Sequence, residues 1–167
     1  MKRKALLPLL AITLFMFACN SSSNESAEQA DSTAHEGMDH TMPTAEVADV
    51  PPVPEGARIF FKNLKDGDVV TSPVKVEMGI EGMSVDTARG IVAGSGHHHI
   101  LVDAGDSLTR GEVVPKDSTH LHFGNAQTEA MVPLSPGKHR LTLQFADGIH
   151  RSYGSRLATS INVEVKQ

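Results

Sequence analysis

The chain has 167 residues, of which 40% are hydrophobic and only 4% aromatic, with no tryptophan. This length suits one globular domain with additional segments, and its core must consist mainly of aliphatic side chains. The formal net charge is -5, and removal of Lys2, Arg3 and Lys4 with a signal peptide would make it -8 (-5 minus 3). This acidic balance argues against nucleic-acid binding, which needs clustered Lys and Arg side chains to contact phosphates.

Residues 1–18 have the layout of a bacterial signal peptide. Three basic residues precede an apolar run from Ala5 to Phe17, which is too short to span a bilayer comfortably. The run ends at Ala18-Cys19, which resembles the lipobox of bacterial lipoproteins, where a small residue precedes the lipidated cysteine. The resemblance implies that Cys19 carries acyl chains and anchors the protein to a membrane of the cell envelope, on its periplasmic or surface face. The alternative is an ordinary signal peptide cleaved near Ala18.

Residues 19–54 are predicted to be a disordered tether. The part from Asn20 to Pro54 contains seven acidic residues and no Lys or Arg, and it is rich in Ser, Ala and Thr. Such a segment cannot bury enough apolar surface to offset the conformational entropy lost on folding.

One cluster in the tether has metal-ligand chemistry. Two imidazoles and two thioethers lie within eight residues, contributed by His35, Met38, His40 and Met42. Thioethers favour Cu(I), and imidazole suits copper and zinc alike. The cluster is similar to the Met- and His-rich stretches of bacterial copper-handling proteins and predicts copper binding; the alternative is that these residues are incidental in a polar linker.

Residues 55–167 are predicted to form one all-β domain. Short alternating apolar runs are separated by Gly, Pro and Asp, and no window has a helical period. Strands are expected around residues 58–61, 74–80, 98–102, 121–123, 141–145 and 161–165. Six or more short strands in this length indicate a small antiparallel sandwich, immunoglobulin-like, with a cupin-like barrel as the alternative.

The chemistry of the domain is expected in its histidines. Seven of them lie between residues 97 and 150, and histidine is the commonest metal ligand in proteins. In a strand, alternate side chains share a face, so His98 lies with Ile100 on the core face. The predicted metal ligands are those on the opposite face, namely His97, His99, His120 and His122. Three or four imidazoles within reach of one another suit copper or zinc.

Four further residues are secondary candidates for the same site. His98 and His139 share a face with core residues, where a buried imidazole hydrogen-bonded to backbone is the more natural role. His150 follows Asp147-Gly148 and is expected in a loop, from which it could join either set. Glu129 is a possible carboxylate ligand.

Several blocks of the sequence resemble a known family. They are Gly96–Asp103 with its three consecutive histidines, His120–Gly124 with Gln127–Glu129, and Pro136–Leu143. Together they are similar to the signature blocks of the domain-of-unknown-function family 4399, over about Arg58 to Val165. The resemblance implies a small exported β-domain and implies no activity.

Three classes of function therefore compete. The first is a metal-binding module of the cell envelope, with copper or zinc as the ion. The second is a cupin-like metalloenzyme, which the His120-x-His122 spacing supports only loosely because Gln127 stands where a carboxylate is expected. The third is a non-catalytic interaction module whose histidines only hydrogen-bond. The sequence has no Gly-x-Ser-x-Gly motif and, once Cys19 is assigned to lipidation, no thiol for catalysis, so an enzyme is the less favoured class.

Overall fold

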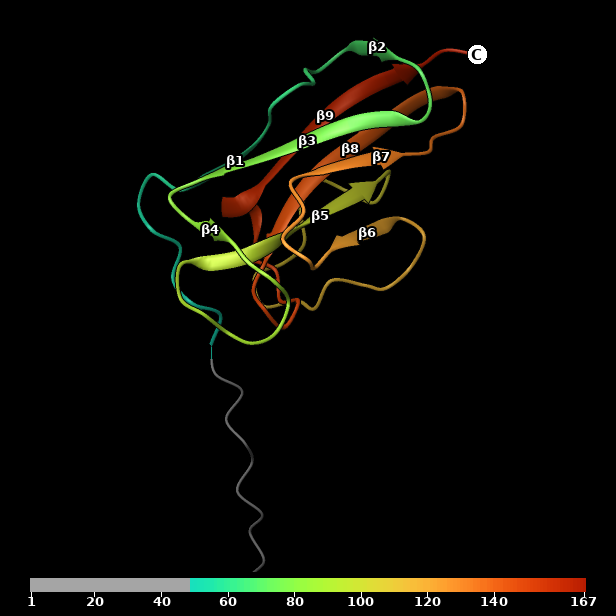
Figure 1. Ribbon diagram of the computed structural model, residues 1–167. Helices are drawn as coiled ribbons and strands as arrows, with labels where there is room; N and C mark the ends of the chain where they lie inside the picture. Colours follow the sequence, from blue (N-terminus) through green and yellow to red (C-terminus); the bar gives the residue numbers. More distant parts are fainter. Residues whose placement is uncertain (1–48) are drawn as a thin grey trace, which may run out of the picture. The chain divides into compact units, whose positions relative to one another are not determined.

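The structure is a computed structural model that describes residues 49–167. These residues form two β-sheets that lie in two layers (Figure 1). The smaller sheet has the order β1 (Arg58–Phe61), β3 (Val74–Glu81), β7 (Glu129–Val132). The larger sheet has the order β2 (Asp68–Val70), β9 (Ala158–Val165), β8 (Gly137–Ala146), β5 (Ser95–Val102), β4 (Ser84–Val85), and β6 (His120–Phe123) also pairs with β5.

The predicted all-β sandwich is confirmed. All six predicted strands are present, and within residues 49–167 the only helical element is a 3-10 turn, η1 (Ser155–Leu157). The longer strands pair antiparallel, as expected, but two short pairs, β2 with β9 and β4 with β5, are parallel. β2 and β4 escaped prediction because they contain only three and two residues, too few to show a period against the neighbouring turns. β7 was also not predicted.

The hydrophobic core lies between the two sheets. Val76 and Met78 of β3 and Ile100, Leu143 and Phe145 of the larger sheet are completely buried in it. Their spacing follows the two-residue period of a strand, so each strand presents its intervening residues to the opposite face. For β5 those intervening residues include His97 and His99.

Loops cover the outer face of the larger sheet where β5 and β8 lie. Gln144 of β8 is completely buried there. Its Oε1 accepts a hydrogen bond from the Leu108 amide at 3.0 Å, and its Nε2 donates to the carbonyls of Gly154 and Leu157 at 3.2 Å. The central part of β5 is therefore buried on both faces, and His97 and His99 are removed from water although they lie outside the sandwich core.

The chain enters the domain before the boundary predicted at Pro54. Val50 is 7% exposed and belongs to the core cluster, and Pro51 is buried. The Arg110 guanidinium donates hydrogen bonds to the carbonyls of Val50 and Pro51 at 2.7 and 2.9 Å. The end of the predicted tether thus packs on the domain. Within residues 49–167 no helix has the length and apolarity needed to cross a membrane.

Candidate metal centre

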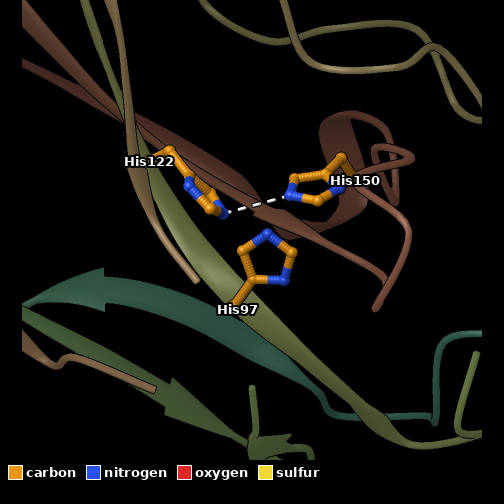
Figure 2. Close-up of side chains that lie close together, drawn as sticks. All are labelled: His97, His122 and His150. Atoms are coloured by element: carbon orange, nitrogen blue, oxygen red, sulfur yellow. Dashed lines mark hydrogen bonds between the residues drawn. The ribbon is translucent and has the colours of Figure 1, made fainter. Parts of the chain in front are cut away.

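Three histidines from separate parts of the chain meet on the outer face of the larger sheet. They are His97, His122 and His150, called here the histidine trio, and Figure 2 shows their rings pointing toward one another. One ring nitrogen from each lies within 4.8 Å of the other two. The Nε2 atoms of His122 and His150 are 3.1 Å apart. The trio therefore has the geometry of a three-nitrogen site for a metal ion.

Strand pairing explains two members of the trio. His97 and His99 share one face of β5, and the antiparallel register with β6 places His122 directly opposite His99. Cross-strand neighbours on one face lie close enough for their side chains to interact. The ring of His122 consequently lies 5.1 Å from that of His97 and 5.2 Å from that of His99, measured between centroids. The alternation predicted from sequence is confirmed here.

A glycine makes room for the His122 ring. A Cβ atom at Gly124 would collide with Nε2 and Cε1 of His122. A larger residue at position 124 would therefore push the His122 ring out of the position it has in the trio. The His120–Gly124 block is one of those that carried the family resemblance, so at least this part of the signature serves the position of a trio histidine.

A braced turn holds the third histidine. His150 closes a turn in which its amide donates to the Asp147 carbonyl, and the buried Asp147 carboxylate accepts hydrogen bonds from the Ile149 and Arg151 amides. The Arg151 guanidinium also pairs with this carboxylate at 2.9 Å. His150 has a φ of 72°, in the left-handed region that non-glycine residues adopt at a cost of about 1–2 kcal/mol. Such strain persists only where the surroundings fix it and is concentrated at functional sites.

Burial keeps two members of the trio, His97 and His122, in the protonation state of a metal ligand. It lowers the pKa of His97 to about 4, and repulsion from His150 and His122 acts in the same direction. Burial, followed by repulsion from His150, also lowers the pKa of His122. Metals bind the neutral imidazole, so His97 and His122 present lone pairs at neutral pH.

One ring of the trio, that of His97, has buried nitrogen atoms without partners. Neither ring nitrogen of His97 has a hydrogen-bond partner in the described part of the chain, although the ring is completely buried. A buried polar group without a partner costs about 1–3 kcal/mol. Nitrogen ligands of a tetrahedral zinc ion at about 2.0–2.1 Å from the metal lie about 3.3 Å apart. The His122–His150 separation is already close to that value, and a bound ion would satisfy His97.

His99 lies next to the trio without belonging to it. Its ring centroid is 4.7 Å from that of His97 and 6.1 Å from that of His150. Burial, together with repulsion from His97 and His122, lowers its pKa to about 2. Its Nδ1 atom is buried without a hydrogen-bond partner. His99 is therefore the nearest imidazole that could add a fourth nitrogen ligand to the trio.

The fourth primary candidate, His120, lies on the same face of the sheet, but its ring is hydrogen-bonded to neighbouring residues outside the trio. Its Nδ1 atom is 2.8 Å from a carboxylate oxygen of Asp117 and 3.1 Å from the Thr119 hydroxyl. The hydrogen bond from His120 holds the pKa of Asp117 well below its usual range. The structure thus groups His97 and His122 with His150, a secondary candidate from sequence, and not with His120.

The other secondary candidates lie away from the trio. His98 faces the core, where its ring contacts Phe145, but neither of its ring nitrogens has the backbone partner that was expected. His139 has the predicted structural role: Nδ1 is 2.7 Å from an Asp103 carboxylate oxygen and Nε2 is 2.9 Å from the Ser135 carbonyl. Glu129 is exposed on β7 in the smaller sheet and pairs with Lys75.

Two sets of predicted residues fall outside the described part of the chain. They are the lipidation site Cys19 and the tether cluster His35, Met38, His40 and Met42.

The fold and the site together define a β-sandwich domain with a cluster of three histidines on the outer face of its larger sheet. The sequence profile of the domain of unknown function DUF4399 matches residues 76–166, and the chain belongs to this family. The match begins within β3, so it covers the trio and the whole of β5 to β8 but not β1. No curated protein and no solved structure matches the chain.

Proposed function

We propose that this protein is a metal-binding module of the bacterial cell envelope, with His97, His122 and His150 as its ligands. The observation that carries the proposal is the trio itself: three imidazole nitrogens within 4.8 Å of one another, one of them on a ring that no protein group satisfies. Lowered pKa values, a strained backbone at His150 and a glycine that accommodates His122 support the same conclusion.

Copper is the preferred ion and zinc the second choice. The trio supplies only imidazole nitrogen, a ligand that suits both ions. For a nitrogen site of this kind the affinity of divalent first-row metals peaks at Cu²⁺. The tether adds two thioethers, at Met38 and Met42, which favour Cu(I). On this proposal the tether and the domain handle the same metal in two oxidation states.

The membrane anchor belongs to the proposal. Lipidation of Cys19 would hold the domain at the envelope, and the intervening segment would let it move relative to the bilayer. Cys19→Ala should shift the protein from the membrane fraction to the soluble fraction, or leave an uncleaved precursor. A processed variant that still sediments with membranes as wild type does would refute the lipid anchor.

The metal assignment is tested by titrating the untagged mature chain with Cu²⁺ and Zn²⁺ and measuring bound metal by elemental analysis. The proposal predicts one tightly bound ion per chain in a His35→Ala/His40→Ala variant, which lacks the imidazoles of the tether cluster. Any additional metal bound by wild type is then attributed to the imidazoles of the tether cluster. If the variant retains no metal after desalting, the trio is not a metal centre.

A further inference from the structure

A cavity adjoins the histidine trio. It has a volume of about 340 Å³, and the rings of His122 and His150 form part of its wall. Ligand pockets in proteins have volumes of about 300–1,000 Å³, so this cavity suits a small molecule. Because it shares two rings with the trio, a ligand in it would lie beside the ion that the trio binds.

The rest of the wall combines apolar surface with one positive charge. Val113, Val114 and Pro115 supply the apolar part, and the adjacent Lys116 supplies an ammonium group. The rings of His99 and His120 complete the wall. The Lys116 charge lies near enough to His122 to contribute to lowering its pKa. The described part of the wall contains no carboxylate. This chemistry is complementary to a small anion with an apolar body.

Three imidazoles leave the coordination of the ion incomplete. Zinc takes four ligands in proteins, and three-histidine sites complete the set with water or an exogenous ligand. His99 is the nearest further imidazole, with its ring centroid 4.7 Å from that of His97 and 5.2 Å from that of His122 but 6.1 Å from that of His150. Its nitrogens are not part of the group that lies within 4.8 Å. The remaining position is therefore available to a molecule in the cavity.

We propose that the trio-bound ion takes a small organic monocarboxylate as its additional ligand. Its carboxylate displaces a metal-bound water and pairs with Lys116, and its aliphatic part packs against Val113, Val114 and Pro115. This inference rests on the proposed metal centre and assigns it a class of ligand. No covalent bond of the carboxylate is made or broken apart from its coordination to the metal.

The test uses the full mature chain of the His35→Ala/His40→Ala variant loaded with one Cu²⁺, because copper absorption reports on a change of ligand. Acetate, butyrate and hexanoate are titrated in turn. Each buried methylene is worth about 0.8 kcal/mol, which corresponds to about fourfold in affinity. Affinity should therefore rise from acetate to hexanoate by more than tenfold. Equal affinities, or no spectral change with any of the three, would overturn the proposal.

Lys116→Met provides the second arm, with Lys138→Met as the control, since Lys138 is exposed and lies on β8 away from this cavity. The loss of an ion pair at a solvated position is worth up to about 1 kcal/mol, or about fivefold. Lys116→Met should weaken butyrate binding by about threefold to fivefold, while Lys138→Met should leave butyrate binding unchanged. Equal butyrate affinity in the two variants would contradict the assigned role of Lys116.

The outcomes separate this inference from the function on which it rests. A chain that binds no copper refutes the metal centre. A chain that binds copper through the trio, with His99 as a fourth imidazole and no response to carboxylates, refutes only the ligand proposal.

Discussion

Two histidine environments in this domain have opposite properties. In the trio, the completely buried His97 ring lies among other imidazoles, burial lowers the pKa of His97 to about 4, and His97 has no hydrogen-bond partner within the described residues. His139 instead contacts the Asp103 carboxylate at 2.7 Å, and this hydrogen bond raises its pKa. Both of its ring nitrogens are engaged, the second by the Ser135 carbonyl.

The difference shows how surroundings decide what a histidine does. A carboxylate neighbour favours the charged ring and engages a ring nitrogen in a hydrogen bond. A buried neighbourhood of imidazoles favours the neutral ring and leaves its lone pairs unused. Only the second environment is prepared for a metal ion. The predictions below change one environment at a time.

The largest expected effect is acid destabilisation of the metal-free protein. Burial lowers the pKa values of His97 and His98 to about 4 and that of His99 to about 2, against 6.5 for an ordinary histidine. Between pH 6.5 and 4 the unfolded chain therefore binds protons that the folded chain does not. Stability is full above pH 6.5 and falls by about 1.4 kcal/mol per pH unit for each such histidine as pH decreases. Denaturant unfolding at pH 7.5 and 5.5 measures this, and equal free energies of unfolding would mean that these rings are not held neutral.

The next effect is on metal affinity. His150→Ala removes one of three ligands and should weaken Cu²⁺ binding by at least about 100-fold, since even supporting residues around metal sites contribute tenfold to 100-fold. His139→Ala is the matched control, because it removes an imidazole of the same domain that lies in the other environment. Its copper affinity should equal that of wild type. Competition titration against a chelator gives both constants, and equal losses in the two variants would place the metal elsewhere.

A third effect concerns the buried histidine that belongs to neither environment. His98 is completely buried against Phe145 with both nitrogens unpartnered. His98→Leu should raise the free energy of unfolding by about 1–3 kcal/mol at pH 7, because it removes two unsatisfied polar atoms from the core. Copper affinity should not change. A destabilised variant in thermal unfolding would show that His98 makes a polar interaction in the folded protein.

The smallest effect is in the His139–Asp103 pair. Asp103→Asn preserves the size of the side chain, and Asn tolerates the left-handed φ of 55° at this position. The raised pKa of His139 contributes stability below pH 6.5 that is lost as pH rises through its folded value. Because Asp103 is about half exposed, the variant should lose about 0.5–1 kcal/mol at pH 5.5. Little loss is expected at pH 8. If Asp103→Asn lowered the free energy of unfolding more at pH 8 than at pH 5.5, the raised pKa assigned to His139 would be contradicted.

Alternation in the sequence was sufficient to predict the sandwich and the faces of its strands. The His-x-His spacing correctly placed His97 and His99 opposite the core, because strand periodicity is a local property. The same reasoning placed His122 on that face. Alternation could not predict the burial of His97 and His99, which comes from loops that reach the outer face through contacts such as Leu108 to Gln144.

The third ligand depended on a tertiary contact. His150 lies in a turn that packs through Gly148 against the loop at Gly90, where a Cβ atom would collide with the Gly90 carbonyl. His150 is 53 positions after His97 in the sequence (150 minus 97), so its place relative to β5 depends on the fold of the chain between them. The Asp147-Gly148 pair indicated a turn, but no local pattern identifies which strand that turn approaches. The hydrogen bond between His120 and Asp117 is, in contrast, a local contact. The spacing of three residues between them could have indicated it.

The most direct test of the trio as a metal centre is a zinc titration of the mature chain with ¹⁵N-labelled histidine, followed by NMR of the ring nitrogens. Zinc is diamagnetic, so each imidazole can be observed with and without the ion. The account predicts that one ring nitrogen each of His97, His122 and His150 shifts at the first equivalent of zinc, while His98 and His139 stay unchanged. If the first equivalent shifts only the tether rings His35 and His40, or a set that omits His97, the trio is not the metal centre of this protein.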